Sequence, residues 1–162
     1  MNKSQADILE KLAGDSTACQ KKSGFIAALQ ETDHHYLLQP TDYFCSWENA
    51  AIVFLMISDE EISPYLIDLL GWLQDLNWPG AEWILARLQR VSSDLLVKPL
   101  ESVAKSASDS KEESWLGNIS ILIANPNMIN LLDAETLKLL KPFAVEYWKW
   151  DYDKIAGHFN LK

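Results

Sequence analysis

Residues 64–91 read PYLIDLLGWLQDLNWPGAEWILARLQRV, and the spacing of their apolar side chains decides the fold class. Leucines recur at positions i, i+3, i+4 and i+7, which places them on one side of an α-helix: Leu66, Leu69, Leu70 and Leu73. Asn-Trp-Pro-Gly at 77–80 breaks this helix, and a second apolar stripe of the same period follows it. Two short amphipathic helices joined by a tight turn are therefore predicted.

Helical segments of the same kind fill the rest of the chain. Its 162 residues are 48% hydrophobic and include only 6 Gly and 6 Pro, which suits one helical domain and argues against a β-sandwich. The predicted helix pairs at 64–91 and 94–124 start about 30 positions apart, a period typical of α-solenoids. We therefore predict an all-α fold, a short HEAT-like α-solenoid of antiparallel helix pairs, with an irregular helical bundle as the alternative.

Two regions are expected within this domain. Residues 1–57 are predicted to form an N-terminal helical segment packed on the same domain, with helices at 16–30 and 43–57. Residues 58–162 are predicted to form the HEAT-like repeat region. The aromatic residues from position 143 onward are expected to make a C-terminal cap, because the last repeat of a solenoid must be covered.

The net charge of −9 comes from one stretch of the chain. Residues 23–86 contain no Lys or Arg, and they hold ten acids: Glu31, Asp33, Asp42, Glu48, Asp59, Glu60, Glu61, Asp68, Asp75 and Glu82. A field of one sign repels nucleic acid and anionic lipid, and it attracts a basic protein. We therefore expect a basic protein partner, no nucleic acid and no membrane; the alternative is an ordinary solvated face.

Three short motifs resemble an uncharacterised bacterial domain family. They are Ser-Asp-Glu-Glu-Ile at 58–62, Leu-Leu-x-Trp-Leu-Gln-Asp at 69–75 and Asn-Trp-Pro at 77–79. The resemblance covers roughly residues 58–140. It implies a HEAT-like fold and no known catalytic activity.

The candidate partner-binding residues combine carboxylates with tryptophans, because Trp is common at binding hot spots and acids steer a basic partner. They are Asp59, Glu60, Glu61, Asp68, Trp72, Asp75, Trp78 and Glu82. The alternative is structural: Trp72 and Trp83 would join adjacent helices, Asp75 or Asn77 would cap the next helix, and Pro79 would stiffen the turn.

The sequence offers little for catalysis. It has no G-x-S-x-G, no Gly-rich phosphate loop with Lys and no H-E-x-x-H, so we expect no catalytic residue, no cofactor and no metal. A metal site is a minor hypothesis, and its ligands would be Asp33, His34 and His158. Trp72, Asp75 and Trp78 match the residue types of HEAT-like alkylpurine glycosylases, but the acidic stretch opposes DNA binding.

A non-enzymatic protein-binding module is the resulting prediction. Its most concrete form is a bacterial immunity protein that neutralises a basic nuclease-type toxin through the acidic surface. A housekeeping adaptor that binds a helix or peptide in its groove is the alternative, and a DNA glycosylase is the remote one. Residues 1–7 include an acid and no apolar stretch, and no apolar run is long enough to span a bilayer, so a cytoplasmic location is expected.

Overall fold

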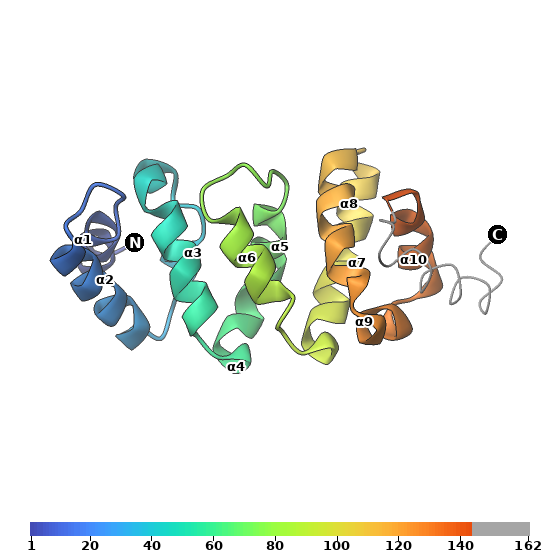
Figure 1. Cartoon of the computed structure of the whole chain (residues 1–162), viewed down its shortest axis with the longest axis horizontal. Helices are drawn as coiled ribbons and strands as arrows, with labels where there is room; N and C mark the ends of the chain where they lie inside the picture. Colours follow the sequence, from blue (N-terminus) through green and yellow to red (C-terminus); the bar gives the residue numbers. More distant parts are fainter. Residues whose placement is uncertain (144–162) are drawn as a thin grey trace.

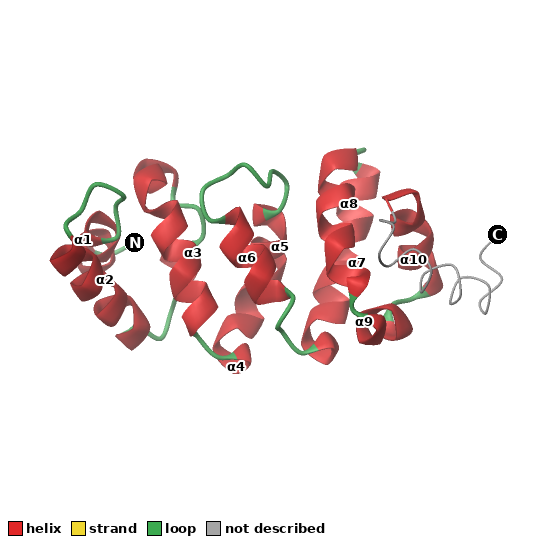
Figure 2. Ribbon diagram, viewed as in Figure 1, coloured by secondary structure: helices red, strands yellow, loops and turns green. Residues whose placement is uncertain are grey.

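The chain is seen in a computed structural model that describes residues 1–143. These residues are helical, and no strand occurs among them, so the predicted all-α class is confirmed. The helices stand side by side along the long axis of the molecule, from α1 and α2 at one end to α10 at the other, with α6 beside α3 and α5 beside α7 (Figure 1). Short loops connect them (Figure 2). The result is an elongated row of short helices.

The α-helices range from one turn to 17 residues. They are α1 (Lys3–Lys11), α2 (Ala18–Gln30), α3 (Trp47–Met56), α4 (Asp59–Ile62), α5 (Leu66–Trp72), α6 (Ala81–Leu88), α7 (Ser93–Asp109), α8 (Glu113–Ser120), α9 (Pro126–Leu131) and α10 (Ala134–Leu140). Shorter 3₁₀ turns lie between or beside them: η1 (His35–Leu37), η2 (Thr41–Ser46), η3 (Ser63–Tyr65), η4 (Ile121–Ala124) and η5 (Lys141–Phe143).

Side-chain caps set several helix starts. Ser58 Oγ accepts a hydrogen bond from the Glu61 backbone N–H at 3.2 Å, and the Glu61 carboxylate accepts one from the Ser58 backbone N–H at 2.9 Å. This reciprocal arrangement is the capping box that the Ser-x-x-Glu sequence predicts, and it begins α4. Asn2 and Thr17 begin α1 and α2 in the same way, each with a glutamine three residues later.

The first predicted helix pair, 64–91, is wrong, whereas α7 and α8 of the second pair, 94–124, do pack against each other. The helices α5 and α6 touch each other only slightly. Instead, α6 packs extensively against α3, and α5 packs against α7. The leucine stripe of α5 is buried as predicted, with Leu66, Leu69 and Leu70 at most 1% exposed. Apolar periodicity thus gives the buried face of each helix, whereas the partner of that face depends on the three-dimensional path of the chain.

One local prediction is wrong. The predicted helix at 43–57 is the 3₁₀ segment η2 followed by α3, with a break at Tyr43 (φ −129°, ψ 41°). Helix α7 continues through Pro99 without a break. Asn125 caps α9, which has Pro126 in its first turn.

The predicted aromatic cap lies outside the described residues, except for Phe143. Phe143 is half-buried and packs against the hydrophobic core. None of the described helices is long and apolar enough to cross a membrane.

Candidate functional site

Three of the predicted partner-binding residues line one groove. Asp68 and Trp72 come from α5, and Trp78 comes from the loop that follows it. The groove has a volume of about 340 Å³. Leu38 and Gln39, from the segment between η1 and η2, form part of its lining. We call this cavity the α5 groove; it combines a carboxylate with indole rings.

The two tryptophans of the α5 groove differ in accessibility. Trp72 is 0% exposed, and its indole Nε1 donates a hydrogen bond to the Pro79 carbonyl at 3.1 Å. Trp47 meets both rings edge-on, with centroids 6.0 Å from Trp72 and 6.1 Å from Trp78. Trp72 therefore belongs to the core and fixes the turn after α5, so the expected anchoring role does not suit it. Trp78 is only half-buried, so part of its side chain is accessible.

Asp68 and its neighbours make the exposed rim of the groove. The Asp68 side chain is exposed, and it has no ion pair or hydrogen bond with any described residue. Ile67 beside it is 54% exposed, an unusual position for a large apolar side chain. A charged group and an apolar surface are thus adjacent at the rim, as in many protein-binding sites.

Asp75 and Asn77 shape the loop instead of capping α6. The Asp75 carboxylate accepts hydrogen bonds from the Asn77 backbone N–H at 2.8 Å and from its side-chain amide at 2.9 Å. The residue at the N-cap of α6 is Gly80, which has no side chain to offer. Asp75 is consequently committed to a local turn, and the capping role that the sequence suggested for it is wrong.

Asp59 forms an ion pair with a buried arginine, Arg87. Its carboxylate accepts a hydrogen bond from Arg87 at 2.8 Å and another from the Ser92 backbone N–H at 2.9 Å. Arg87 is only 5% exposed, and it also donates to the carbonyls of Phe54 and Ile57 at the end of α3. Asp59 therefore neutralises a buried charge and holds α3, α4 and α6 together. The sequence gives no sign of this role, because the three acceptors of Arg87 lie 28 to 33 positions earlier in the chain.

The stability of the fold should depend on the ionisation of Asp59. The Ser92 N–H and the Arg87 guanidinium lower the pKa of Asp59 below its ordinary value of 3.8. Such a group stabilises the fold fully above its unfolded pKa and less as the pH falls through its folded pKa. We expect stability to decline below about pH 4, and Asp59→Asn to make that decline shallower. Urea unfolding of the wild type and of Asp59→Asn, at neutral pH and at several values below about pH 4, measures the decline in stability. Equal declines in the two proteins would contradict the role of Asp59 in the acid dependence of stability.

The remaining predicted acids lie apart from one another. Glu61 caps α4, while Glu60 in α4 and Glu82 in α6 are exposed, with no ion pair to any described residue. Helix α4 lies at one end of α5, and the loop before α6 lies at the other (Figure 1). The acids therefore form a spread field along the molecule, with Asp68 at the α5 groove.

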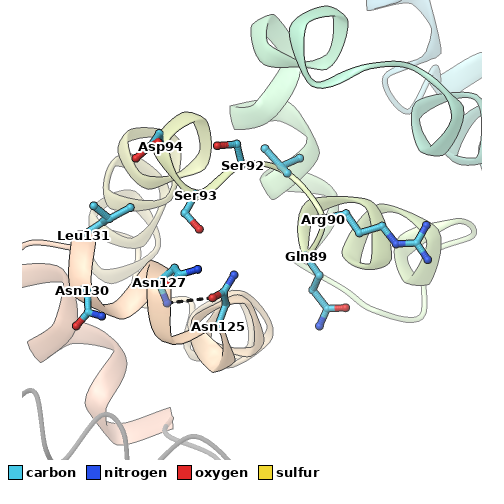
Figure 3. Close-up of a pocket in the computed structure, with 10 residues that line it drawn as sticks. Gln89, Arg90, Ser92, Ser93, Asp94, Asn125, Asn127, Asn130 and Leu131 are labelled. Atoms are coloured by element: carbon cyan, nitrogen blue, oxygen red, sulfur yellow. Dashed lines mark hydrogen bonds between the residues drawn. The ribbon is translucent and has the colours of Figure 1, made fainter.

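A second, more polar cavity of about 560 Å³ lies between the end of α6, the start of α7 and helix α9. Figure 3 shows Asn125, Asn127 and Asn130 on one side of it and Gln89 and Arg90 on the other. Arg90 extends away from the asparagines, and Asn125 is occupied by its hydrogen bond from the Asn127 backbone N–H at 3.0 Å (Figure 3). Asp94, in the first turn of α7, is the other charged residue of the lining.

Metal binding finds no support in the described part of the chain, where no group of three or more His, Cys, Asp or Glu could hold an ion. His34 is 2% exposed, and its Nε2 lies 3.2 Å from the Ala28 carbonyl. Asp33 instead accepts hydrogen bonds from the His35 backbone N–H and the Tyr65 hydroxyl. His158 lies outside the described residues. The first two residues of the metal hypothesis thus have structural partners.

The fold and its groove define an all-helical protein with an acidic surface and an aromatic-lined cavity. Residues 48–156 match the family described as a domain of unknown function, DUF5071. Because the match spans more than half of the chain, the protein belongs to this family. No curated protein and no solved structure matches the chain.

Proposed function

We propose that the protein is a HEAT-like α-solenoid that binds a basic protein through its acidic surface, and that it acts as a bacterial immunity protein against a nuclease-type toxin. In this proposal the carboxylates steer the toxin and cover its nucleic-acid site, and Trp78 packs against it from the α5 groove. No catalytic step is required of the protein.

The observation that carries the proposal is the uncompensated charge of residues 23–86. Of the ten acids there, only Asp59 forms an ion pair within the described residues. No Lys or Arg occurs in that stretch, and the first base after it, Arg87, is buried against Asp59. Surfaces normally mix both signs of charge, so a stretch without any cation favours a basic partner.

An adaptor that binds a helix or peptide in the α5 groove is the second candidate. The exposed Ile67 and half-buried Trp78 favour it, because both offer apolar contact area at the rim. A DNA glycosylase is not proposed: Trp72 is buried, Asp75 is used in a turn, and the acidic field opposes the phosphate backbone. A gene for a basic toxin beside this one would favour the immunity protein over the adaptor.

Reversing three exposed acids should abolish capture of the partner. We expect tagged wild-type protein to retain a basic protein from lysate of its own host at about 50 mM salt, where screening is weak. The variant Glu60→Lys, Asp68→Lys, Glu82→Lys should retain at most about a tenth as much, because six units of charge favourable to the complex are lost. Mass spectrometry identifies and quantifies the retained protein.

A matched control variant shows whether partner capture depends on the acids of residues 23–86 or only on the net charge of the protein. Asp94, Glu113 and Glu135 are also exposed acids in first turns of helices, but they lie outside residues 23–86. Reversing these three to Lys changes the net charge and the helix dipoles in the same way. Retention by this control variant should stay near the wild-type level. Equal loss with both variants would show that only net charge matters, and no retention by the wild-type protein would refute the proposal.

A further inference from the structure

Gly71 lies in the lining of the α5 groove, at a position where the fold does not require glycine. Its φ is not positive, and a Cβ at this position would meet no atom within 4 Å. Every other glycine of residues 1–143 has a neighbour within that distance. Glycine is a poor helix former, so its place in α5 brings no benefit to the described part of the fold. A glycine of this kind suits the close approach of another molecule to the helix backbone.

The face of α5 that contains Gly71 is accessible. Ile67 and Asp68 precede Gly71 by about one helical turn, so the three residues share this face. The Ile67 side chain is 54% exposed, and Asp68 is exposed and forms no ion pair with any described residue. Trp78, which is half-buried, lines the same groove from the loop after α5. Apolar surface, a carboxylate and the free space at Gly71 thus occur together in one groove.

The size and charge of the α5 groove favour a long cationic side chain. A helix is about 10–12 Å across with its side chains, so a cavity of about 340 Å³ holds one large side chain of a helix or loop that lies across it. Among the described residues of the lining, Asp68 is the only charged one. Arginine complements these features, because its methylene stem packs on apolar surface while its planar guanidinium pairs with carboxylates and stacks on aromatic rings.

We propose that the α5 groove receives one arginine side chain of the basic partner. The stem of this arginine lies over Gly71 and against Ile67. Its guanidinium pairs with Asp68 and packs on the accessible part of Trp78. This inference rests on the proposed function, for which it supplies an anchor point that the spread field of acids does not. Gly71 determines specificity in this arrangement, because any side chain at position 71 would occupy the space of the arginine stem.

The probe is N-acetylarginine amide, titrated into the ¹⁵N-labelled full chain at about 50 mM salt. We expect shifts concentrated at residues 38–39 and 67–78. The affinity should be about fivefold higher than for N-acetylleucine amide and about threefold higher than for N-acetyllysine amide. Equal or tighter binding of the leucine compound would identify an apolar occupant and overturn the proposal. Equal binding of the lysine compound would overturn the choice of arginine.

Gly71→Leu provides the sharpest test, because it fills the groove where the fold has room. Leucine is a good helix former, so Tm should stay within about 2 °C of the wild-type value or rise. Affinity for the arginine compound should fall about tenfold or more, and about threefold in Gly71→Ala, which adds a single carbon atom. A glycine with a merely structural role would lower Tm when replaced and leave the affinity unchanged, and that result would overturn the proposal.

Asp68→Asn tests the charge in the groove, with Glu82→Gln as its control. Both acids are exposed and lie in the first turn of a helix, α5 or α6, so each substitution removes one charge from a similar position. Asp68→Asn should weaken arginine binding about fivefold, whereas Glu82→Gln should weaken it less than twofold. Equal effects would show that the compound follows the general field of acids, and they would overturn the α5 groove as its site.

Failure of this inference can be told from failure of the proposed function. If the arginine compound did not bind in the groove, but the wild-type chain still captured a basic protein that acid reversal released, the proposed function would stand without this anchor. If the wild-type chain captured no basic protein, the proposed function would fall whatever the compound did. Binding of the compound is measured on the purified chain, so the two results are independent.

Discussion

Arg87→Ala is expected to lower the free energy of unfolding by about 3–5 kcal/mol, because it removes a buried guanidinium that binds two carbonyls and the partly exposed carboxylate of Asp59. Arg87 is 5% exposed and donates to three acceptors: the Phe54 and Ile57 carbonyls at 3.2 and 3.0 Å and the Asp59 carboxylate at 2.8 Å. Its removal leaves these groups without their donor and opens a void between α3 and α6. Urea denaturation followed by circular dichroism measures the loss.

Arg90→Ala is the matched control. Arg90 follows Arg87 by one helical turn, is exposed, and forms no ion pair with any described residue. Its replacement should change the free energy of unfolding by less than about 0.5 kcal/mol. Similar losses for the two variants would mean that Arg87 does not join the helices as its contacts indicate.

Gly80→Ala should destabilise the fold by about 2–4 kcal/mol, through both backbone strain and overpacking. Gly80 is the N-cap of α6 and has a φ of +84°, a conformation that side chains disfavour. A Cβ at this position would lie 2.6 Å from the Ala51 Cβ and 3.0 Å from the Trp47 carbonyl oxygen. The close approach of α3 and α6 therefore requires glycine. Thermal or urea unfolding of the variant measures the effect.

Gly71→Ala tests the same substitution where the fold tolerates it. Gly71 lies in α5, and a Cβ there would meet no atom within 4 Å. Alanine is the better helix former, so this variant should be as stable as the wild type or about 0.5 kcal/mol more stable. If both glycine variants lost stability alike, the explanation from the close contact at Gly80 would be wrong.

The helices were predictable because their signals are local. The leucine stripe of α5 and the Ser58 capping box depend on residues at most seven positions apart, and both occur as predicted. The packing partners were not predictable in this way: α6 lies against α3, about 30 residues earlier in the chain. Arg87 illustrates the limit, since its acceptors come from α3 and α4, and its own helix gives no sign of them.

Some features of the candidate site are likewise visible in the sequence, and others depend on contacts between distant residues. The lack of Lys and Arg in residues 23–86 is visible in the sequence, and the structure shows which acids are exposed. Whether a given acid is available depends on distant partners, as with Asp59, and whether a tryptophan is accessible depends on packing, as with Trp72. Residues 33–43 have no helical or strand periodicity, so the place of Leu38 and Gln39 in the α5 groove left no signal in the sequence.

The central claim is that electrostatic attraction brings a basic protein to this acidic surface. The most direct test is the association rate of the captured basic protein with the wild-type chain, measured by stopped flow as salt is raised from about 50 to about 500 mM. The account predicts a fall of about tenfold or more, with little change in the dissociation rate. An association rate that does not depend on salt would contradict it.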